Sequence, residues 1–136
     1  MLEKLGYEAA LRMLEGAVSE IRANHEMLSK LDSVGGDGDH GTTMVRAMTS
    51  LEKAAAGGCQ NLKSLFHDIG WAILGVDGGA TGPLLGTFFM SMSEAVTSDM
   101  LDAAALASVF EAGLAGVQAQ SKARVGDKTL IDALVP

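Results

Sequence analysis

The sequence predicts an all-α protein, a bundle of about six helices formed by a single domain over residues 1–136. Apolar residues recur every three or four positions through most of the chain, as on the buried face of a helix. Only 4% of the residues are aromatic while 48% are hydrophobic, mostly Ala, Leu, Met and Val, which favours helices over sheets. No segment alternates convincingly as a strand would, and only two prolines are present.

The first two predicted helices flank a glycine-rich loop. The helical period runs from Leu5 to Leu31, which predicts one long first helix. The stretch VGGDGDHGTT at residues 34–43 then interrupts the period. A second helix is expected to begin where this loop ends, with Thr42 or Thr43 in its first turn or as its cap.

The other predicted helices alternate with further loops. A third helix covers residues 62–73 and is closed by glycines. The fourth follows a second glycine-rich loop, GVDGGATGP, with Thr81 as a candidate cap and Pro83 in the first turn, where a missing N–H is tolerated. TSDMLD at 97–102 opens a fifth helix, whose apolar residues run from Leu106 to Val117, and a short sixth begins near Leu130, after VGDKT.

Charge and cysteine content exclude several classes of protein. The formal net charge of −7, the pI near 4.8 and the lack of a basic run argue against a nucleic-acid surface. Cys59 is the only cysteine, which excludes an intrachain disulfide and a cysteine-based metal site and favours a reducing cytoplasm. No apolar run approaches the roughly 18 residues of a membrane span, so we expect a soluble cytoplasmic protein.

Three aspartates lie in or beside the first loop and point to a divalent cation. Asp32, Asp37 and Asp39 fall within eight residues, and the glycines between them allow their carboxylates to converge. Two carboxylates about 4 Å apart repel by roughly 4 kcal/mol at an effective dielectric of about 20, so such a group must separate, protonate or share cations. Oxygen ligands without cysteine favour Mg²⁺, Mn²⁺ or Ca²⁺ over zinc. The spacing lacks the last-position Glu of an EF-hand.

The same loop has the glycine spacing of a phosphate-binding turn, at Gly36, Gly38 and Gly41. A dinucleotide fingerprint would follow a strand, whereas this loop follows a helix, and no P-loop consensus is present. A loop that reaches phosphates through a metal ion remains, with amides at the start of the next helix as direct donors. The second loop adds close backbone approach, a hydroxyl and another helix start. The alternative is that both loops merely connect helices, with glycines for turning and aspartates for capping.

Three motifs resemble those of a known family, in order and with similar intervals. They are LDSVGGDGDHGTTM at 31–44, GGATGPLLGTFF at 78–89 and GDKTLIDAL at 126–134, and they are similar to the nucleotide-binding L subunit of dihydroxyacetone kinase over essentially the whole chain. The resemblance implies an antiparallel α-helical barrel that binds ADP or ATP at its top through two Mg²⁺ ions. It therefore agrees with the helical bundle read from the apolar period.

The resemblance also implies roles for individual residues. Asp32, Asp37 and Asp39 would be the metal ligands, two helix starts would hold the phosphates, and the third motif would lie near the nucleoside. The residues beside the phosphates would be His40, Thr42, Thr43, Gly78, Gly79 and Thr81, and those near the nucleoside Gly126, Asp127, Thr129 and Leu130.

The family transfers a phosphoryl group to a substrate held elsewhere. A separate K subunit or domain binds dihydroxyacetone, or a related short ketose or polyol, on one of its histidines, and the L part delivers the γ-phosphoryl group. In phosphotransferase-system versions a phosphocarrier subunit rephosphorylates the bound nucleotide, and in others ATP exchanges as a substrate; the sequence favours neither. Such transfer needs positioning and charge neutralisation, which Mg²⁺ and helix-terminal amides supply without a nucleophile in this chain.

Three departures from the family pattern bear on activity. Asp77 and Gly35 stand where the family usually has apolar residues, which adds charge near the phosphates and loosens the first loop. The chain also stops where family members continue with two further helices that close over the nucleotide. We therefore expect a gap filled by a second copy or by another polypeptide, or a chain that is a fragment. The alternative function is a truncated, non-catalytic nucleotide- or metal-binding relative that regulates the K partner.

Overall fold

The chain forms an all-α structure, as predicted. The computed structural model describes residues 4–36, 38–58, 60–76 and 80–121. Over these ranges the only strand-like pairing is one antiparallel bridge between Leu5 and Leu101. The helices are α1 (Tyr7–Ala23), α2 (His25–Asp32), α3 (His40–Ala55), α4 (Leu62–Leu74), α5 (Thr81–Ala95) and α6 (Ala103–Gln120).

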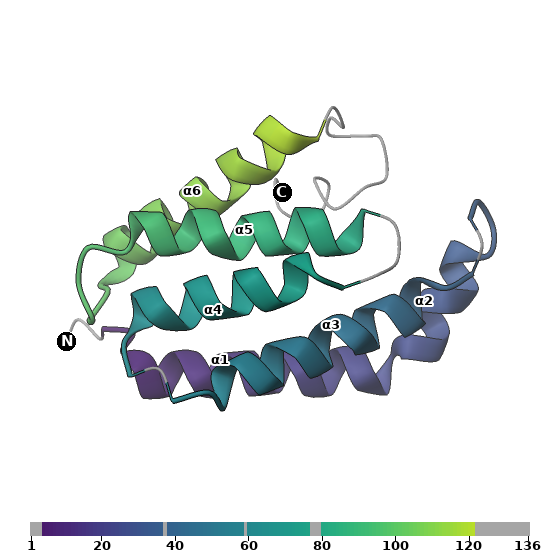
Figure 1. The fold of residues 1–136 in the computed structure, drawn as a ribbon, viewed down its shortest axis with the longest axis horizontal. Helices are drawn as coiled ribbons and strands as arrows, with labels where there is room; N and C mark the ends of the chain where they lie inside the picture. Colours follow the sequence, from purple (N-terminus) through teal and green to yellow (C-terminus); the bar gives the residue numbers. More distant parts are fainter. Residues whose placement is uncertain (1–3, 37, 59, 77–79, 122–136) are drawn as a thin grey trace.

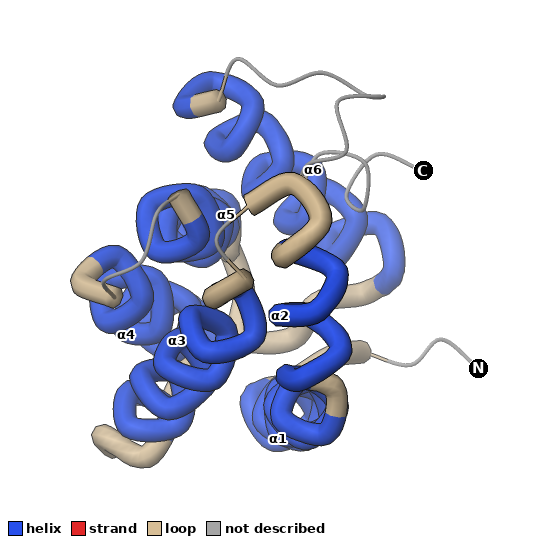
Figure 2. The backbone as a smooth tube through the Cα atoms, turned by 90° about the vertical axis from the view of Figure 1, so that its right-hand side faces the viewer, coloured by secondary structure: helices blue, strands red, loops and turns tan. Residues whose placement is uncertain are grey.

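The long helices pack side by side in an arc. α1 packs on α3, α3 on α4, α4 on α5 and α5 on α6, while the short α2 packs mainly on α3. Figure 2 looks along the helices and shows this arc end-on. Because successive long helices run in opposite directions (Figure 1), the starts of α3 and α5 and the end of α6 lie at the same end of the bundle. The helix starts that belong to the two glycine-rich motifs therefore share one end of the bundle although they are far apart in the sequence.

The prediction of one continuous helix over residues 5–31 is wrong, because the chain breaks at Asn24. This residue has φ −114° and ψ 12°, and its Nδ2 donates to the carbonyl of Glu20 at 2.8 Å. The ring Nδ1 of His25 bonds to the carbonyl of Arg22, also at 2.8 Å. Side chains that bond nearby carbonyls compete with the helical ladder. The break gives α2 a direction of its own, along which it contacts the start of α3.

Two helix starts also differ from the predictions in detail. α3 begins at His40, inside the glycine motif, so Thr42 and Thr43 fall in its first turn as expected. α5 begins at Thr81 itself, so Thr81 is not the cap, although Pro83 does lie in the first turn. The number of described helices equals the predicted number only because the first helix is split. The predicted helix near residue 130 lies outside the described residues.

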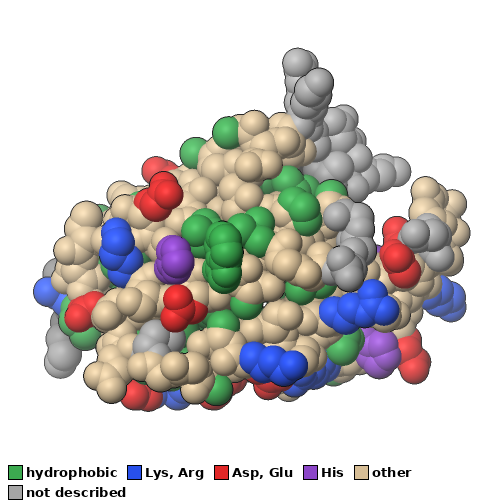
Figure 3. Space-filling view, in the orientation of Figure 1, with side chains coloured by type: hydrophobic (Ala, Val, Ile, Leu, Met, Phe, Trp, Pro, Cys, Tyr) green, Lys and Arg blue, Asp and Glu red, His purple; other side chains and the backbone are tan. Residues whose placement is uncertain are grey.

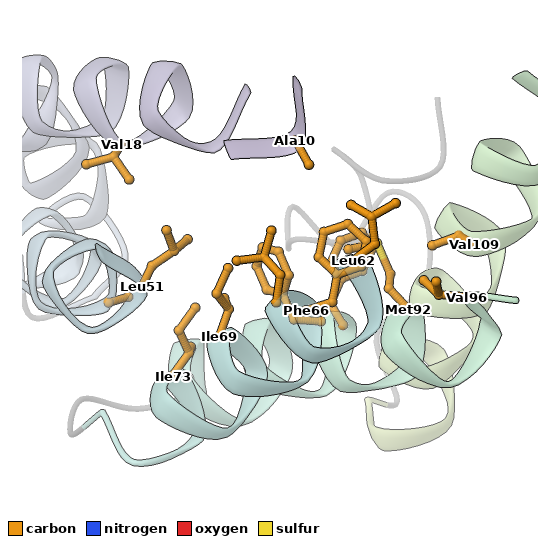
Figure 4. Close-up of a cluster of buried hydrophobic side chains, with 14 of the residues drawn as sticks. Ala10, Val18, Leu51, Leu62, Phe66, Ile69, Ile73, Met92, Val96 and Val109 are labelled. Carbon is orange, nitrogen blue, oxygen red and sulfur yellow. The ribbon is translucent and has the colours of Figure 1, made fainter. Parts of the chain in front are cut away.

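The hydrophobic core lies inside the arc and is centred on α4. Leu62, Leu65, Ile69 and Ile73 of this helix are fully buried. Figure 4 shows side chains from α1, α3, α5 and α6 converging on the same helix. Each such aliphatic side chain stabilises the fold by about 1.5–3 kcal/mol relative to its exposed state. The helical period in the sequence therefore corresponds to a packed interior.

The outer surface is mixed in character. On the face drawn in Figure 3, acidic and basic side chains are interspersed and a hydrophobic patch lies near the middle. Trp71 on α4 is 69% exposed, and Leu74 on the same helix is also exposed. Throughout the part of the chain that the structure describes, every helix is too short or too polar to cross a membrane.

The start of α4 supports a first stability prediction. The side chain of Asn61 accepts the N–H of Ser64 at 2.9 Å and so caps the helix. Asn61→Ala should lower the free energy of unfolding by about 1 kcal/mol, or the melting temperature by about 2–4 °C at this chain length. Asn61→Ser should retain most of the stability. Thermal denaturation followed by circular dichroism measures both, and an unchanged melting temperature for the alanine variant would contradict the cap.

Candidate functional site

Asp32, the last residue of α2, organises the first glycine loop. Its carbonyl accepts the N–H of Gly36 at 2.7 Å. Its carboxylate Oδ2 accepts two further amides, those of Gly38 at 3.1 Å and His40 at 3.3 Å. Gly38 has φ +77°, a conformation that glycine adopts without a steric penalty. One aspartate therefore folds the loop back onto the end of its own helix.

The first amides of α3 are capped by side chains of α2. The N–H of His40 donates to Asp32, and the N–H of Gly41 donates to Oγ of Ser29 at 2.9 Å. The side chain of the N-cap residue itself, Asp39, does not make the capping hydrogen bond. These two amides already have acceptors on α2, and donation to phosphates by amides at the start of this helix stays a prediction.

The start of α5 is different, because its N-cap cannot provide such an acceptor. The N-cap is Ala80, which has only a methyl side chain, and its carbonyl accepts the first helical bond from Leu84 at 3.0 Å. The amides at the start of a helix need an acceptor from outside the helix, and the helix dipole favours an anion there. The N-cap of α5 therefore supplies no side-chain acceptor that would compete with an anion for these amides.

A pocket of about 400 Å³ lies between the starts of α3 and α5. This volume is within the range of about 300–1,000 Å³ that is usual for small-molecule sites. Met44, Leu84 and Leu85 give it apolar walls. The described residues that line it are His40, Met44, Ala80, Thr81, Leu84, Leu85 and Ser121.

The structure brings together only part of the predicted phosphate-binding set. His40 and Thr81, from different motifs, line the same pocket. Thr42 instead lines a separate hollow of about 450 Å³ with residues of α1 and α2. Thr43 is buried, with 2% of its surface exposed. The predicted residues that lie outside the described ranges are Asp37, Gly78, Gly79, Gly126, Asp127, Thr129 and Leu130, together with Asp77.

The carboxylates predicted to bind metal are only partly described. Asp32 is half-buried and Asp39 is exposed, while Asp37 lies outside the described residues. Oδ1 of Asp32 accepts no hydrogen bond from the described residues, because the amides of Gly38 and His40 both bond to Oδ2. Within the described ranges no three His, Cys, Asp or Glu side chains gather as a metal site would require. The metal site therefore stays a prediction that depends on Asp37.

Sequence reasoning missed Ser29 and the walls of the pocket. Ser29 lies three residues before Asp32, so the two share a face of α2, and this spacing was an available signal. Met44, Leu84 and Leu85 have helical spacing and could not be told from core residues. For Ser121 the sequence offers no signal, because its place in the pocket depends on where α6 ends.

The chain is similar to several proteins of known name. The DAK2 domain family matches residues 34–136. The "PEP-dependent dihydroxyacetone kinase 1, ADP-binding subunit DhaL" of Listeria innocua is 41% identical over 128 residues, which cover 93% of this chain and 65% of that protein. The "PTS-dependent dihydroxyacetone kinase, ADP-binding subunit DhaL" of Lactococcus lactis is 38% identical, covering 83% of this chain and 57% of that protein. The "PEP-dependent dihydroxyacetone kinase, ADP-binding subunit DhaL" of Escherichia coli is 37% identical, with 82% and 54% covered.

The chain thus spans between 54% and 65% of the length of these three curated relatives. Their names confirm the resemblance that the three motifs indicate. The family match begins at residue 34, so it includes both helix starts that form the pocket. On the family match over residues 34–136 and identities of 37–41% to these relatives, this chain belongs to the DAK2 domain family.

Proposed function

We propose that this chain binds ADP or ATP with Mg²⁺ in the pocket between α3 and α5, as the nucleotide-carrying phosphotransfer subunit of a dihydroxyacetone kinase. The observation that carries the proposal is that His40 and Thr81, from two separate motifs, line one pocket at two helix starts. The relatives named as ADP-binding subunits support the choice of nucleotide.

The two helix starts suggest how the nucleotide lies. The phosphates bind at the start of α5, where amides need an outside acceptor and Thr81 supplies a hydroxyl. The start of α3 contributes the side chain of His40 rather than its capped amide. The apolar walls formed by Met44, Leu84 and Leu85 take the flat base.

The described carboxylates fit a hard divalent cation. Asp32 offers Oδ1, because its hydrogen bonds to the loop amides all use Oδ2, and Asp39 is exposed one residue before His40. Carboxylate oxygens are the ligands that Mg²⁺ prefers. Asp32, Asp39 and the sequence-predicted Asp37 would hold two Mg²⁺ ions. When bound, Mg²⁺ neutralises phosphate charge and so favours phosphoryl transfer.

The relatives also suggest the phosphoryl donor and the partners. The three relatives at 37–41% identity have names that begin with PEP-dependent or PTS-dependent. We therefore favour a system in which the nucleotide stays bound and is rephosphorylated by a phosphocarrier subunit in the cytoplasm. The acceptor is dihydroxyacetone, or a related ketose or polyol, held by a K-type partner.

Isothermal titration of the 136-residue chain with ADP tests the proposal, with and without Mg²⁺ and with AMP as the matched ligand that lacks the β-phosphate. Micromolar, Mg²⁺-dependent binding of ADP and much weaker binding of AMP are expected, because AMP lacks the β-phosphate charge that the cation and the start of α5 would favour. Absence of ADP binding by a folded chain would contradict the proposal. Binding without phosphoryl transfer, when a K-type partner and donor are added, would instead support the non-catalytic alternative.

A further inference from the structure

α2 and α3 lie very close together at Gly41. A Cβ atom on Gly41 would lie 1.8 Å from the carbonyl oxygen of His25 and 2.5 Å from Oγ of Ser29. The backbone of α3 therefore lies directly on α2 at this point, with no room for a side chain. Because the two helices are so close here, a change in a single group on α2 can shift the start of α3.

Ser29 is the α2 residue whose side chain bonds to the backbone of α3 at this contact. Its Oγ accepts the N–H of Gly41, while Asp32, one turn later on the same face, accepts the N–H of His40. Two consecutive amides of α3 are thus capped by a different helix. An N-cap residue usually satisfies these amides from within its own helix, but the side chain of Asp39 does not do so here.

From this geometry we infer that Ser29 is a positioning residue of the nucleotide pocket, an inference that rests on the proposed function. Its hydroxyl fixes the first turn of α3 against α2. That turn carries His40 into the pocket and sets Asp39 relative to Asp32. Ser29 itself does not line the pocket, so it acts through the position of α3 and not by contact with the ligand.

Amide hydrogen exchange by NMR, measured without nucleotide, tests the positioning role directly. Ser29→Ala should speed exchange of the Gly41 amide about tenfold, the effect of removing this side-chain acceptor. The Thr43 amide, bonded to the carbonyl of Asp39 at 2.9 Å, is the internal reference and should change less. Ser29→Thr, which keeps the hydroxyl, should restore slow exchange. Ser19→Ala, an exposed serine on α1, is the matched control and should change nothing.

Titration of the same variants with ADP and Mg²⁺ tests the link to the pocket. Ser29→Ala should weaken ADP binding about tenfold, and Ser29→Thr should recover it. Unchanged exchange at Gly41, or faster exchange with unchanged ADP affinity, would overturn the inference. If the wild-type chain binds no ADP, the proposed function fails, and the role of Ser29 in the pocket fails with it. Faster exchange of the Gly41 amide in Ser29→Ala would then still show that Ser29 caps this amide.

Discussion

Replacing Gly41 with alanine should destabilise the protein by about 3 kcal/mol, near the upper end for overpacking in a tight interior, and weaken Mg²⁺-dependent ADP binding by at least tenfold. The added methyl would fall 1.8 Å from the backbone carbonyl oxygen of His25. A backbone atom cannot rotate away as a side chain can, so α2 and α3 must separate. Separation breaks the bond from the Gly41 amide to Ser29 and shifts the helix start that carries His40.

The destabilisation is a net value, because alanine is by itself the better helix former. Alanine is favoured over glycine in a helix interior by about 1 kcal/mol, which the clash must exceed. Gly16 is the matched control: it lies within α1 and a Cβ there would meet nothing within 4 Å. Gly16→Ala should therefore raise stability by about 0.5–1 kcal/mol.

Thermal unfolding, denaturant unfolding and ADP titration of both variants measure the difference. Gly41→Ala should lower the melting temperature by about 10 °C, since about 1 kcal/mol corresponds to a few degrees at this chain length. If Gly41→Ala were as stable as Gly16→Ala, the close contact between α2 and α3 would be refuted. If Gly41→Ala had normal stability but no longer bound ADP, Gly41 would be needed for ligand binding and not for helix packing.

The helices that were predicted well are those with strong local signals. α4 was expected over residues 62–73 and is observed at Leu62–Leu74, because its apolar period is regular and glycines follow it. The break at Asn24 was missed because the apolar period continues across it. The boundary between α1 and α2 is set instead by the side-chain bonds of Asn24 and His25 to nearby carbonyls and by the packing of α2 on α3.

The residues of the candidate site that lie in sequence motifs could be predicted, whereas contacts between helices could not. His40 and Thr81 were found from motifs, and the structure places both in one pocket. Which of Thr42 and Thr43 faces outward depends on how α3 is rotated, and contacts with other helices set that rotation. For Ser29 the sequence offers its spacing to Asp32 on α2, but its partner, the Gly41 amide, lies on a different helix and could not be read from that spacing.

Asp32→Asn should separate the two roles of this carboxylate, loop organisation and metal binding. An asparagine oxygen can still accept the amides of Gly38 and His40, so the loop and the fold should persist. The loss of charge should cost only about 1 kcal/mol of stability, the difference between charged and neutral hydrogen bonds. Mg²⁺-dependent ADP affinity should fall about 100-fold or more, because even groups that only support metal ligands change affinity by about 10–100-fold.

Asp102→Asn is the matched control, because Asp102 caps α6 by accepting the N–H of Ala105 at 2.8 Å and does not line the pocket. It should lose a similar, small amount of stability and bind ADP normally. Asp32→Ala removes the acceptor as well, so it should lower both the melting temperature and the ADP affinity. Titration calorimetry at several Mg²⁺ concentrations, with thermal denaturation of each variant, gives both quantities. ADP binding by Asp32→Asn with wild-type affinity and wild-type Mg²⁺ dependence would show that Asp32 serves the loop alone, and the metal site would then have to be assigned to other residues.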